Sequence, residues 1–121
     1  MSVFSNIAAD SILYQGEHFF LIKDGFPVSP GHILIISNLE KLDYFELNAN
    51  ERQELTGLID RAKSIIEKDY KPDGYNIGMN CGVVAGQSVM HFHCHVIPRY
   101  QGDMKNPKGG IRHCIEGKGN Y

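Results

Sequence analysis

The sequence predicts an α+β domain with a mainly antiparallel sheet, and two observations carry this prediction. Short apolar runs bounded by turn residues fill the first third of the chain, and one long amphipathic helix precedes two further strand-like runs. Strands, then a helix, then strands again are typical of an α+β fold. With 121 residues, 42% of them hydrophobic, the chain is long enough for one domain with a real core and too short for two.

Five segments are expected to form strands. The first three are rich in Ile, Leu and Phe and are separated by Gly-containing turns, whereas the last two follow the helix. We expect the strands at residues 12–14, 18–23, 32–37, 75–80 and 89–97. Residues 26–31 contain two prolines, which block a regular helix there. The last strand should stop at Pro98.

Two helices are expected between the third and fourth strands. Asn48 and Glu51 form a capping-box pattern at the start of the longer helix, which should end near Tyr70 before a Pro-Asp-Gly turn. Its apolar residues recur every three or four positions. They are Leu55, Leu58, Ile59, Ala62, Ile65 and Ile66. A second capping-box pattern, SNLE at residues 37–40, predicts a short helix that reaches about residue 47.

Composition argues against several classes of function. Lys and Arg total 12 and Asp and Glu total 14, so the net charge of −2 disfavours a basic protein that binds nucleic acid polymers. No apolar run approaches the ~20 residues of a membrane span. The first residues lack the features of a signal peptide, so we expect no membrane association and no secretion. The three cysteines show no disulfide framework, and reduced thiols in a cytoplasmic protein are expected.

Residues 99–121 differ in charge from the rest of the chain. They hold 5 Lys and Arg against 2 Asp and Glu, together with five of the 13 glycines. One interpretation is a solvated, irregular segment. The other is a mobile basic segment that approaches an anionic substrate, with Arg99 offsetting phosphate charge.

The candidate chemistry concentrates in residues 86–98, GQSVMHFHCHVIP. His91, His93 and His95 alternate there with three apolar residues. Successive side chains of a strand point to opposite faces, so the three imidazoles should share one face while the apolar residues enter the core.

Three interpretations of this histidine face remain open. It could be a half-exposed strand face, although such faces usually carry Lys, Glu or Thr. Imidazoles at i and i+2 with a further ligand could hold zinc. Alternatively, one imidazole could attack phosphorus while the other two orient groups and handle protons. The loop GVVAGQS at residues 82–88 favours the third, because its glycines let the backbone approach a phosphate and Gln87 and Ser88 offer neutral donors.

The histidine segment resembles the signature of the histidine triad (HIT) family, in which three histidines alternate with apolar residues on one strand. Residues 26–37, FPVSPGHILIIS, resemble the family's proline-rich turn into Gly-His and an apolar strand. The ending IPRY and the tail NPKGGIRHCIEGKGNY are similar to bacterial members of the dinucleoside-polyphosphate hydrolase branch. The resemblance covers nearly the whole chain and implies a single HIT domain over residues 1–121. It also implies a five-stranded antiparallel sheet with one long and one short helix, a homodimer, and hydrolysis or transfer at the α-phosphate of a nucleotide.

The resemblance further implies roles for individual residues. His93 would be the nucleophile, and His91 and His95 would contact phosphate oxygens or hold the network. His32 would hydrogen-bond among these imidazoles. The implied nucleotide-binding residues are Asp24 at the ribose, Asn80 as a polar contact, Gly86, Gln87 and Ser88 by the α-phosphate, and Phe4, Ile7 and Ile22 at the base. Asp24 could instead simply cap a turn.

One departure from the family pattern concerns metal. Many bacterial relatives begin with a Cys-x-x-Cys pair that helps to hold structural zinc, whereas this chain has Ser2-Val3-Phe4-Ser5. A hydroxyl does not replace a thiolate as a zinc ligand. We therefore expect no structural zinc and no required cofactor, although a divalent ion could accompany the substrate phosphates.

The chain also contains no Trp, and so lacks the Trp-containing ending of the phosphoramidase branch. This absence favours a dinucleoside polyphosphate, such as diadenosine tetraphosphate, over the alternative substrate, a purine nucleoside phosphoramidate in which AMP is joined to an amine or a lysine. A zinc- or nucleotide-binding module without catalysis is the remaining alternative.

Overall fold

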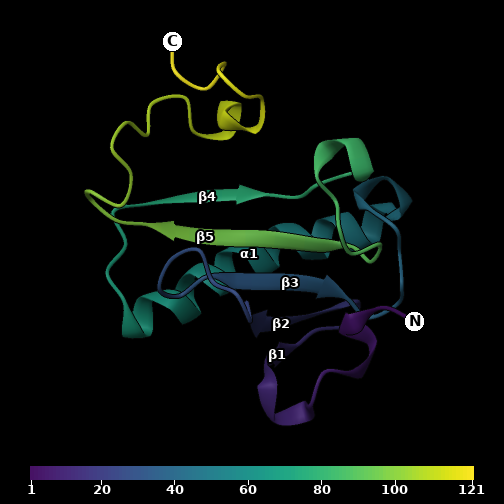
Figure 1. The fold of residues 1–121 in the computed structure, drawn as a ribbon. Coiled ribbons are helices and arrows are strands. Elements are labelled where there is room, and N and C mark those ends of the chain that lie inside the picture. Colours follow the sequence, from purple (N-terminus) through teal and green to yellow (C-terminus); the bar gives the residue numbers. More distant parts are fainter.

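The computed structural model describes residues 1–121 and contains one antiparallel sheet. Its strands are β1 (Ile12–Gln15), β2 (Phe19–Lys23), β3 (Ile33–Ser37), β4 (Gly74–Gly78) and β5 (His93–Arg99). They are arranged in the order β1-β2-β3-β5-β4, so that β1 and β4 form the edges (Figure 1). The predicted α+β class and five-stranded antiparallel sheet are confirmed.

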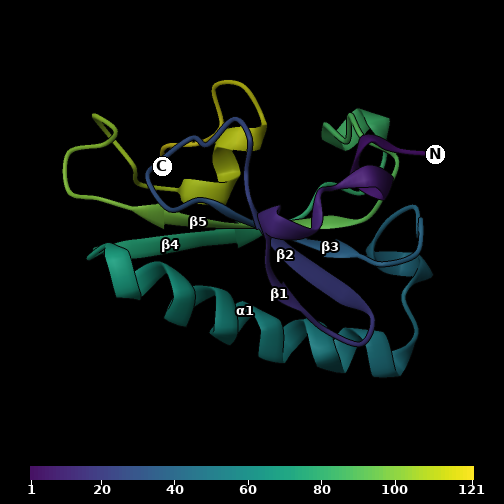
Figure 2. The ribbon, with the colours of Figure 1, turned by 90° about the horizontal axis from the view of Figure 1, so that it is seen from below.

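A single α-helix, α1 (Ala49–Asp69), covers one face of the sheet (Figure 2). The predicted capping box is formed, because Glu51 N–H donates to the side-chain oxygen of Asn48 and Asn48 N–H donates to the Glu51 carboxylate, each at 2.8 Å. The helix ends one residue before Tyr70, close to the predicted position. The predicted long helix is therefore confirmed.

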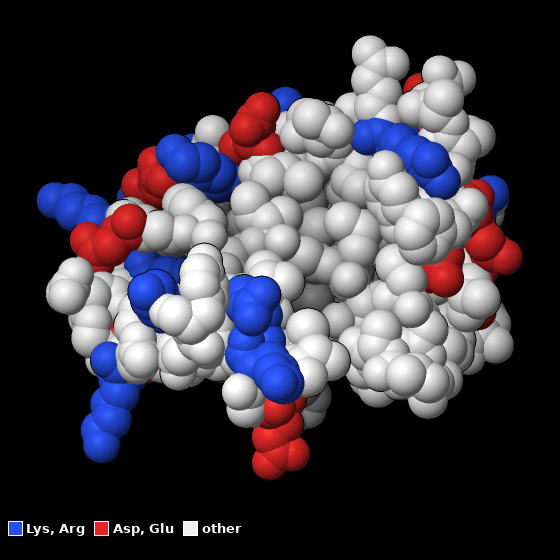
Figure 3. Space-filling model, turned by 90° about the horizontal axis from the view of Figure 1, so that it is seen from above, with Lys and Arg blue, Asp and Glu red and all other residues white.

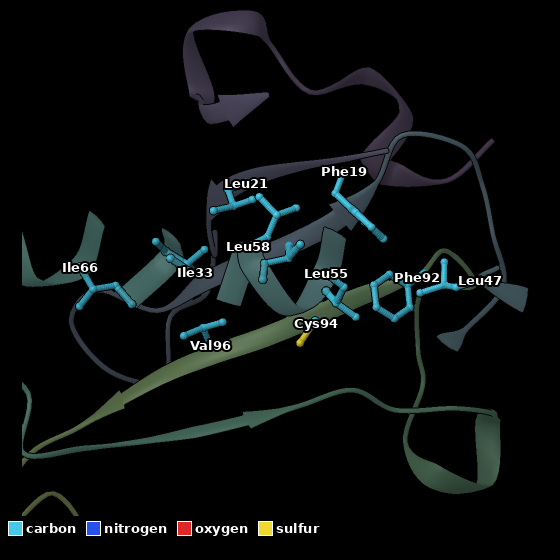
Figure 4. Close-up of a cluster of buried hydrophobic side chains, with 12 residues drawn as sticks. Phe19, Leu21, Ile33, Leu47, Leu55, Leu58, Ile66, Phe92, Cys94 and Val96 are labelled. Carbon is cyan, nitrogen blue, oxygen red and sulfur yellow. The ribbon is translucent and has the colours of Figure 1, made fainter. Parts of the chain in front are cut away.

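The apolar residues of β2 and β3 are buried on both faces of the sheet. One face packs on the stripe of α1 (Figure 4), in a cluster formed by Phe19, Leu21, Ile33, Ile35, Leu47, Leu55, Leu58, Ala62, Ile66, Phe92, Cys94 and Val96. The opposite face buries Phe20, Ile22, Leu34 and Ile36 against the N-terminal segment, which contributes Phe4, Ile7 and Ile12. Burial on both faces explains why these strands read as continuous apolar runs.

The short helix predicted over residues 37–47 is wrong. Ser37 is the last residue of β3, and its N–H donates to the carbonyl of Phe92. The Glu40 carboxylate accepts hydrogen bonds from the N-terminal segment instead of reaching back to Ser37. Only a three-residue 3-10 turn, η3 (Tyr44–Glu46), forms in this region.

The last strand begins and ends later than the predicted range of 89–97. The register of β5 with β3 stops at Val96, so at Pro98 the strand is paired with β4 alone. A proline is tolerated where one side of a strand needs no ladder hydrogen bond. Because β5 begins at His93, the first histidine of the motif, His91, lies before the strand.

Four further 3-10 turns are η1 (Val3–Asn6), η2 (Ala9–Ser11), η4 (Val83–Ala85) and η5 (Gly110–Cys114). Figure 2 shows η1, η4 and η5 on the side of the sheet away from α1. These short segments therefore surround the face that carries the histidines. No helix combines the length and the apolar character that a membrane span would require.

Candidate functional site

Two of the three motif histidines lie within β5, on the sheet face opposite α1. His93 and His95 are two residues apart in β5, and their ring centroids lie 5.2 Å apart. The apolar residues between and beside them enter the core as predicted, with Cys94 fully buried. Burial raises the pKa of the Cys94 thiol to about 12, so this thiol is protonated and unreactive at neutral pH.

His93 presents an unprotonated ring nitrogen. Its Nδ1 lies 2.8 Å from the carbonyl oxygen of His91, and a carbonyl can only accept. The proton of a neutral ring is therefore on Nδ1, which leaves a lone pair on Nε2. No protein group hydrogen-bonds to Nε2, and the ring lines a cleft. This nitrogen is free to attack an electrophile.

His95 presents the opposite tautomer. The N–H of Val28 donates to Nδ1 of His32 at 3.2 Å, so a neutral His32 carries its proton on Nε2. That nitrogen lies 2.9 Å from Nδ1 of His95 and donates to it. His95 must then carry its own proton on Nε2, and this N–H is available as a hydrogen-bond donor. The implied role of His32, a hydrogen bond among the imidazoles, is therefore present in the structure.

Burial keeps this second pair of rings uncharged. It lowers the pKa of His32 and lowers that of His95 to about 4, the neighbouring rings of His93 and His32 adding to the effect on His95. The Asp24 carboxylate opposes both shifts without reversing them. At neutral pH His95 thus presents a neutral N–H donor on the ring adjacent to that of His93.

His91 has a different position from the other two histidines. Its ring is completely buried, and its Nε2 lies 2.7 Å from the carbonyl oxygen of Ser37. Its Nδ1 therefore accepts from the hydroxyl of Ser2, 2.5 Å away. The three imidazoles lie on one side of the sheet as predicted, because Phe4 packs against the rings of both His91 and His93. His91, however, precedes β5 and does not line the cleft beside His93. Of the two roles implied for His91, its burial favours holding the network over contacting phosphate.

A cleft of about 710 Å³ opens beside His93 and His95. Such a volume lies within the range of small-molecule sites. Its lining includes eight of the residues expected at the site: Phe4, Ile7, Ile22, Asp24, Asn80, Ser88, His93 and His95. The lining combines apolar side chains with two imidazoles, the mixture that a nucleotide with an aromatic base and a phosphate would need.

A second hollow of about 940 Å³ borders His32 and His95. It shares Asp24, Phe26 and Asn80 with the first cleft and is otherwise lined largely by apolar side chains of β4, η4 and η5. Figure 3 views the molecule from the side of the C-terminal segment and shows an uncharged, hollowed centre with charged side chains around it. His95 borders both hollows, so a ligand that reaches this ring has room in either one.

Asp24 is both a turn cap and a site residue. Its Oδ1 accepts from the N–H of Phe26 at 2.8 Å, and its Oδ2 lies 3.4 Å from Nε2 of His32. Its side chain is 14% exposed and borders both hollows. A carboxylate held at the mouth of a cleft can accept from a hydroxyl group of a ligand.

Of the three residues expected near a phosphate in the loop between β4 and β5, two border a hollow and one is buried. Ser88 is exposed to the first cleft and Gly86 borders the second. Gln87 is buried, and its amide binds the N–H of Gly82 and the carbonyls of Leu42 and Val89. With both ends of its amide engaged, Gln87 shapes the loop, and its contact with a phosphate stays a prediction.

Arg99 does not reach the imidazoles. Its guanidinium binds the Asp103 carboxylate at 2.6 and 2.8 Å and the side-chain oxygen of Asn76 at 2.6 Å. Lys23 is the one Lys or Arg that borders either hollow. The expectation that Arg99 offsets phosphate charge is therefore not met in this structure.

The donor sets of this face do not fit a zinc ion. Near the N-terminus the candidate ligands are the hydroxyls of Ser2 and Ser5, which already hydrogen-bond to His91 and Glu40 and are not zinc ligands. Asp24, His32 and His95 also converge. The facing nitrogens of the two rings, however, are 2.9 Å apart, whereas nitrogens on one tetrahedral zinc lie about 3.4 Å apart. Both sets are arranged as hydrogen-bond networks.

Two neighbours of the histidines, Ser2 and Glu40, are not among the residues that the sequence predicts for the site. Ser2 was identified only as a departure from a zinc motif, and Glu40 was assigned to a capping box. The signal that relates them is tertiary, because 38 residues separate Ser2 from Glu40 along the chain. A pattern search along one segment cannot detect such a contact.

Comparisons with known proteins agree with this architecture. Residues 6–102 match the HIT domain. An uncharacterized HIT-like protein of Methanocaldococcus jannaschii is 39% identical over 101 residues, which cover 82% of this chain and 76% of that protein. Two named enzymes are each 30% identical. The bis(5'-adenosyl)-triphosphatase of Saccharomyces cerevisiae matches over 78% of this chain, and the AP-4-A phosphorylase of Mycobacterium tuberculosis matches over 76%. The matched regions span only 47% and 48% of those two enzymes.

Solved structures share the fold as well as the sequence. The crystal structure of a HIT family member from Bacillus subtilis superimposes with a TM-score of 0.76 at 30% identity, over 84% of this chain and 75% of that one. A Zn-bound histidine triad family protein from Mycobacterium smegmatis has a TM-score of 0.70 at 30% identity, over 78% and 69% of the two chains. On its fold, its histidine arrangement and these matches, the chain belongs to the HIT family.

Proposed function

We propose that this protein is a nucleotide hydrolase or transferase that cleaves dinucleoside polyphosphates, of the diadenosine tetraphosphate type, at the α-phosphate. Membership of the HIT family supports the broader activity on nucleotides. The matches to a bis(5'-adenosyl)-triphosphatase and an AP-4-A phosphorylase support the narrower substrate class. The observation that carries the proposal is the unprotonated Nε2 of His93 facing the cleft beside the N–H donor of His95.

In the first step, Nε2 of His93 attacks the α-phosphorus while the bond from that phosphorus to the bridging oxygen breaks. The leaving polyphosphate takes the bonding electron pair, and the nucleotide becomes bonded to His93. Charge that develops on the imidazole is stabilised through Nδ1–H by the carbonyl of His91. We expect the N–H of His95 and the hydroxyl of Ser88, both of which border the cleft, to donate to the non-bridging oxygens.

In the second step, water attacks the same phosphorus and the phosphorus–nitrogen bond breaks. The mononucleotide leaves, the water proton passes to solvent, and neutral His93 is restored. Both steps depend on positioning and on hydrogen-bond donors, which is the usual basis of catalysis in phosphoryl transfer.

The protonation of His95 favours a polyphosphate over an amine as the leaving group. A polyphosphate departs as an anion and needs no proton, whereas an amine must be protonated as it leaves. Because the pKa of His95 is lowered to about 4, this ring has no spare proton to give at neutral pH. Phosphoramidate hydrolysis is therefore the second candidate.

The experiment incubates the protein separately with diadenosine tetraphosphate and with adenosine 5′-phosphoramidate, in excess chelator, and resolves the products by chromatography. We expect AMP and ATP from the tetraphosphate. AMP from the phosphoramidate alone would transfer the assignment to the second candidate. Activity that appears only when zinc or another divalent ion is added would mean that the chemistry needs a metal. No product under any condition would leave a nucleotide-binding module.

We also propose that two copies of the chain pair along β4. This strand is an edge of the sheet, and Ile77 on it is 43% exposed. Unpaired edge strands readily bind a second strand, and such pairing between identical chains gives a symmetric dimer. Light scattering should give twice the chain mass of 13.6 kDa, and Ile77→Glu should shift the mass toward one chain. A single-chain mass for the wild type at micromolar concentration would contradict the dimer.

A further inference from the structure

The N-terminal segment is tied to the rest of the molecule through one small cluster of polar groups. The backbone N–H of Ser2 donates to the Glu40 carboxylate at 3.1 Å, and the hydroxyl of Ser5 donates to the same oxygen at 2.6 Å. The hydroxyl of Ser2 accepts from the N–H of Phe4 at 3.0 Å and donates to Nδ1 of His91. The one other hydrogen bond from residues 1–8 to the remainder of the chain is short-range, from the N–H of Ser11 to the carbonyl of Ala8 at 2.9 Å.

The segment held in this way forms one wall of the nucleotide cleft. Phe4 and Ile7 line the cleft, and the ring of Phe4 meets the ring of His93 edge to face at a centroid distance of 5.1 Å. The same phenyl ring lies 5.7 Å from the ring of His91. Displacement of residues 3–7 would therefore open the cleft and remove a packing partner of the nucleophile.

A second connection runs from Ser2 to the reactive nitrogen through His91. The Ser37 carbonyl, which can only accept, places the proton of His91 on Nε2, and the Ser2 hydroxyl donates to the remaining Nδ1, so the ring is held from both sides. The backbone carbonyl of His91 in turn holds Nδ1–H of His93. The orientation of the His93 lone pair thus depends on where the His91 residue is held.

We infer that Ser2, acting with Glu40, is a positioning residue that fastens the N-terminal wall over the nucleophile by hydrogen bonds, without a metal ion. The expected effect on kcat rests on the proposed function, whereas the expected effect on the mobility of the N-terminal segment does not. The Ser2 hydroxyl already bonds to the buried His91 ring and to the N–H of Phe4, and the Ser5 hydroxyl bonds to the Glu40 carboxylate, at 2.5 to 3.0 Å. The two hydrogen bonds from Ser5 and Ser2 lower the pKa of Glu40, so its carboxylate stays ionised as an acceptor at neutral pH.

The test compares Ser2→Ala, Ser2→Thr and Glu40→Gln with Ser64→Ala. Ser64 is an exposed serine of α1 whose hydroxyl bonds only to the carbonyl of Asp60, four residues earlier, so it is a matched control. Each variant is measured for hydrogen–deuterium exchange of residues 3–8, for AMP affinity, and for kcat and KM on diadenosine tetraphosphate in chelator.

We expect Ser2→Ala to speed exchange in residues 3–8, to weaken AMP binding, and to lower kcat by about ten-fold, the scale of one lost hydrogen bond in the activated complex. Ser2→Thr retains a hydroxyl and should restore most of kcat. Glu40→Gln should speed exchange less than Ser2→Ala, because an amide oxygen still accepts. Ser64→Ala should match the wild type throughout.

The outcomes separate this inference from the proposed function. If the wild type cleaves neither diadenosine tetraphosphate nor adenosine 5′-phosphoramidate, the proposed function fails. Hydrogen–deuterium exchange of residues 3–8 and AMP affinity would still decide whether Ser2 holds the N-terminal segment in place. Unchanged exchange in Ser2→Ala would overturn the inference, and so would faster exchange with unchanged AMP affinity and kcat. One zinc per chain in the purified wild type that Ser2→Ala loses would also overturn it, because the fastening would then depend on metal.

Discussion

The two faces of the sheet are built by different kinds of interaction. The face under α1 is a continuous apolar core, and the helix that covers it has its own local signals, a capping box and a regular stripe. The opposite face is covered by short turns and loops, and there the histidines are held by hydrogen bonds between segments 54 to 89 residues apart. Stability should therefore depend mainly on the first face and chemistry mainly on the second.

The largest effect should come from the reactive face. Replacing His93 with Gly removes the nucleophile, so turnover of diadenosine tetraphosphate should fall by at least about 1,000-fold, a loss typical of a missing covalent catalyst. The unfolding free energy should change little, because the ring is only partly buried. The matched control is His18→Gln, which alters a histidine that binds Glu54. Wild-type turnover by His93→Gly would show that another group reacts.

A pair of truncations compares the faces directly. Leu58→Ala on α1 should cost about 2–5 kcal/mol of unfolding free energy, because it leaves a cavity in the core, and KM of the remaining folded enzyme should be unchanged. Phe4→Ala should have the converse effect, a raised KM with a smaller loss of stability, since Phe4 is half-buried in the cleft wall. Denaturant unfolding and steady-state kinetics measure both. Equal effects of the two variants on KM would contradict the assignment of stability to one face and chemistry to the other.

Mild acid should lower the free energy of unfolding through two histidines of the reactive face. His32 and His95 have lowered pKa values in the folded state, so below about pH 6.5 the unfolded chain binds protons that the folded chain does not. The unfolding free energy should therefore fall as the pH drops from about 6.5 toward 4, by at most about 1.4 kcal/mol per pH unit from each group.

The pKa of His18 is raised chiefly by Glu54, so this residue has the opposite effect on the pH dependence of the unfolding free energy. The contribution of His95 is therefore best measured as the difference between the wild type and a His95 variant. Urea unfolding of the wild type and of His95→Asn should give a shallower pH slope for the variant. Parallel slopes would mean that His95 is protonated to the same extent in the folded and unfolded states, which would contradict its lowered pKa.

The smallest effect concerns the start of α1. Asn48→Ala removes one half of the capping box and should cost about 1 kcal/mol of unfolding free energy. Asn50→Ala, two residues later and exposed, should change it by less than about 0.5 kcal/mol. Thermal or urea unfolding measures both, and kcat should be unaffected in either variant.

The contrast between the faces also explains which predictions from the sequence succeeded. The helix over Ala49–Asp69 follows from residues that are neighbours on one helix surface, so periodicity and capping were sufficient. The pairing of His93 with His95 follows equally from the two-residue period of a strand.

The sequence was less informative for polar groups that have two possible hydrogen-bond partners, one nearby in the chain and one distant. Ser37 and Glu40 have the spacing of a capping box, yet one is used by β3 and the other by the N-terminal segment. For Gln87 the structure shows backbone partners at Gly82, Leu42 and Val89, and its contact with a phosphate stays a prediction. Local spacing cannot decide between a near partner and a distant one, because the distant one exists only once the sheet has formed.

The most direct test of the account is to trap the nucleotide on the protein. The enzyme is mixed with diadenosine tetraphosphate for milliseconds, quenched by denaturation at alkaline pH, where a phosphorus–nitrogen bond survives, and digested for mass spectrometry. The account predicts an AMP adduct on the peptide that contains His93, localised to that residue, and no adduct in His93→Gly. Rapid product formation with no adduct at any time, or an adduct on another residue, would contradict it.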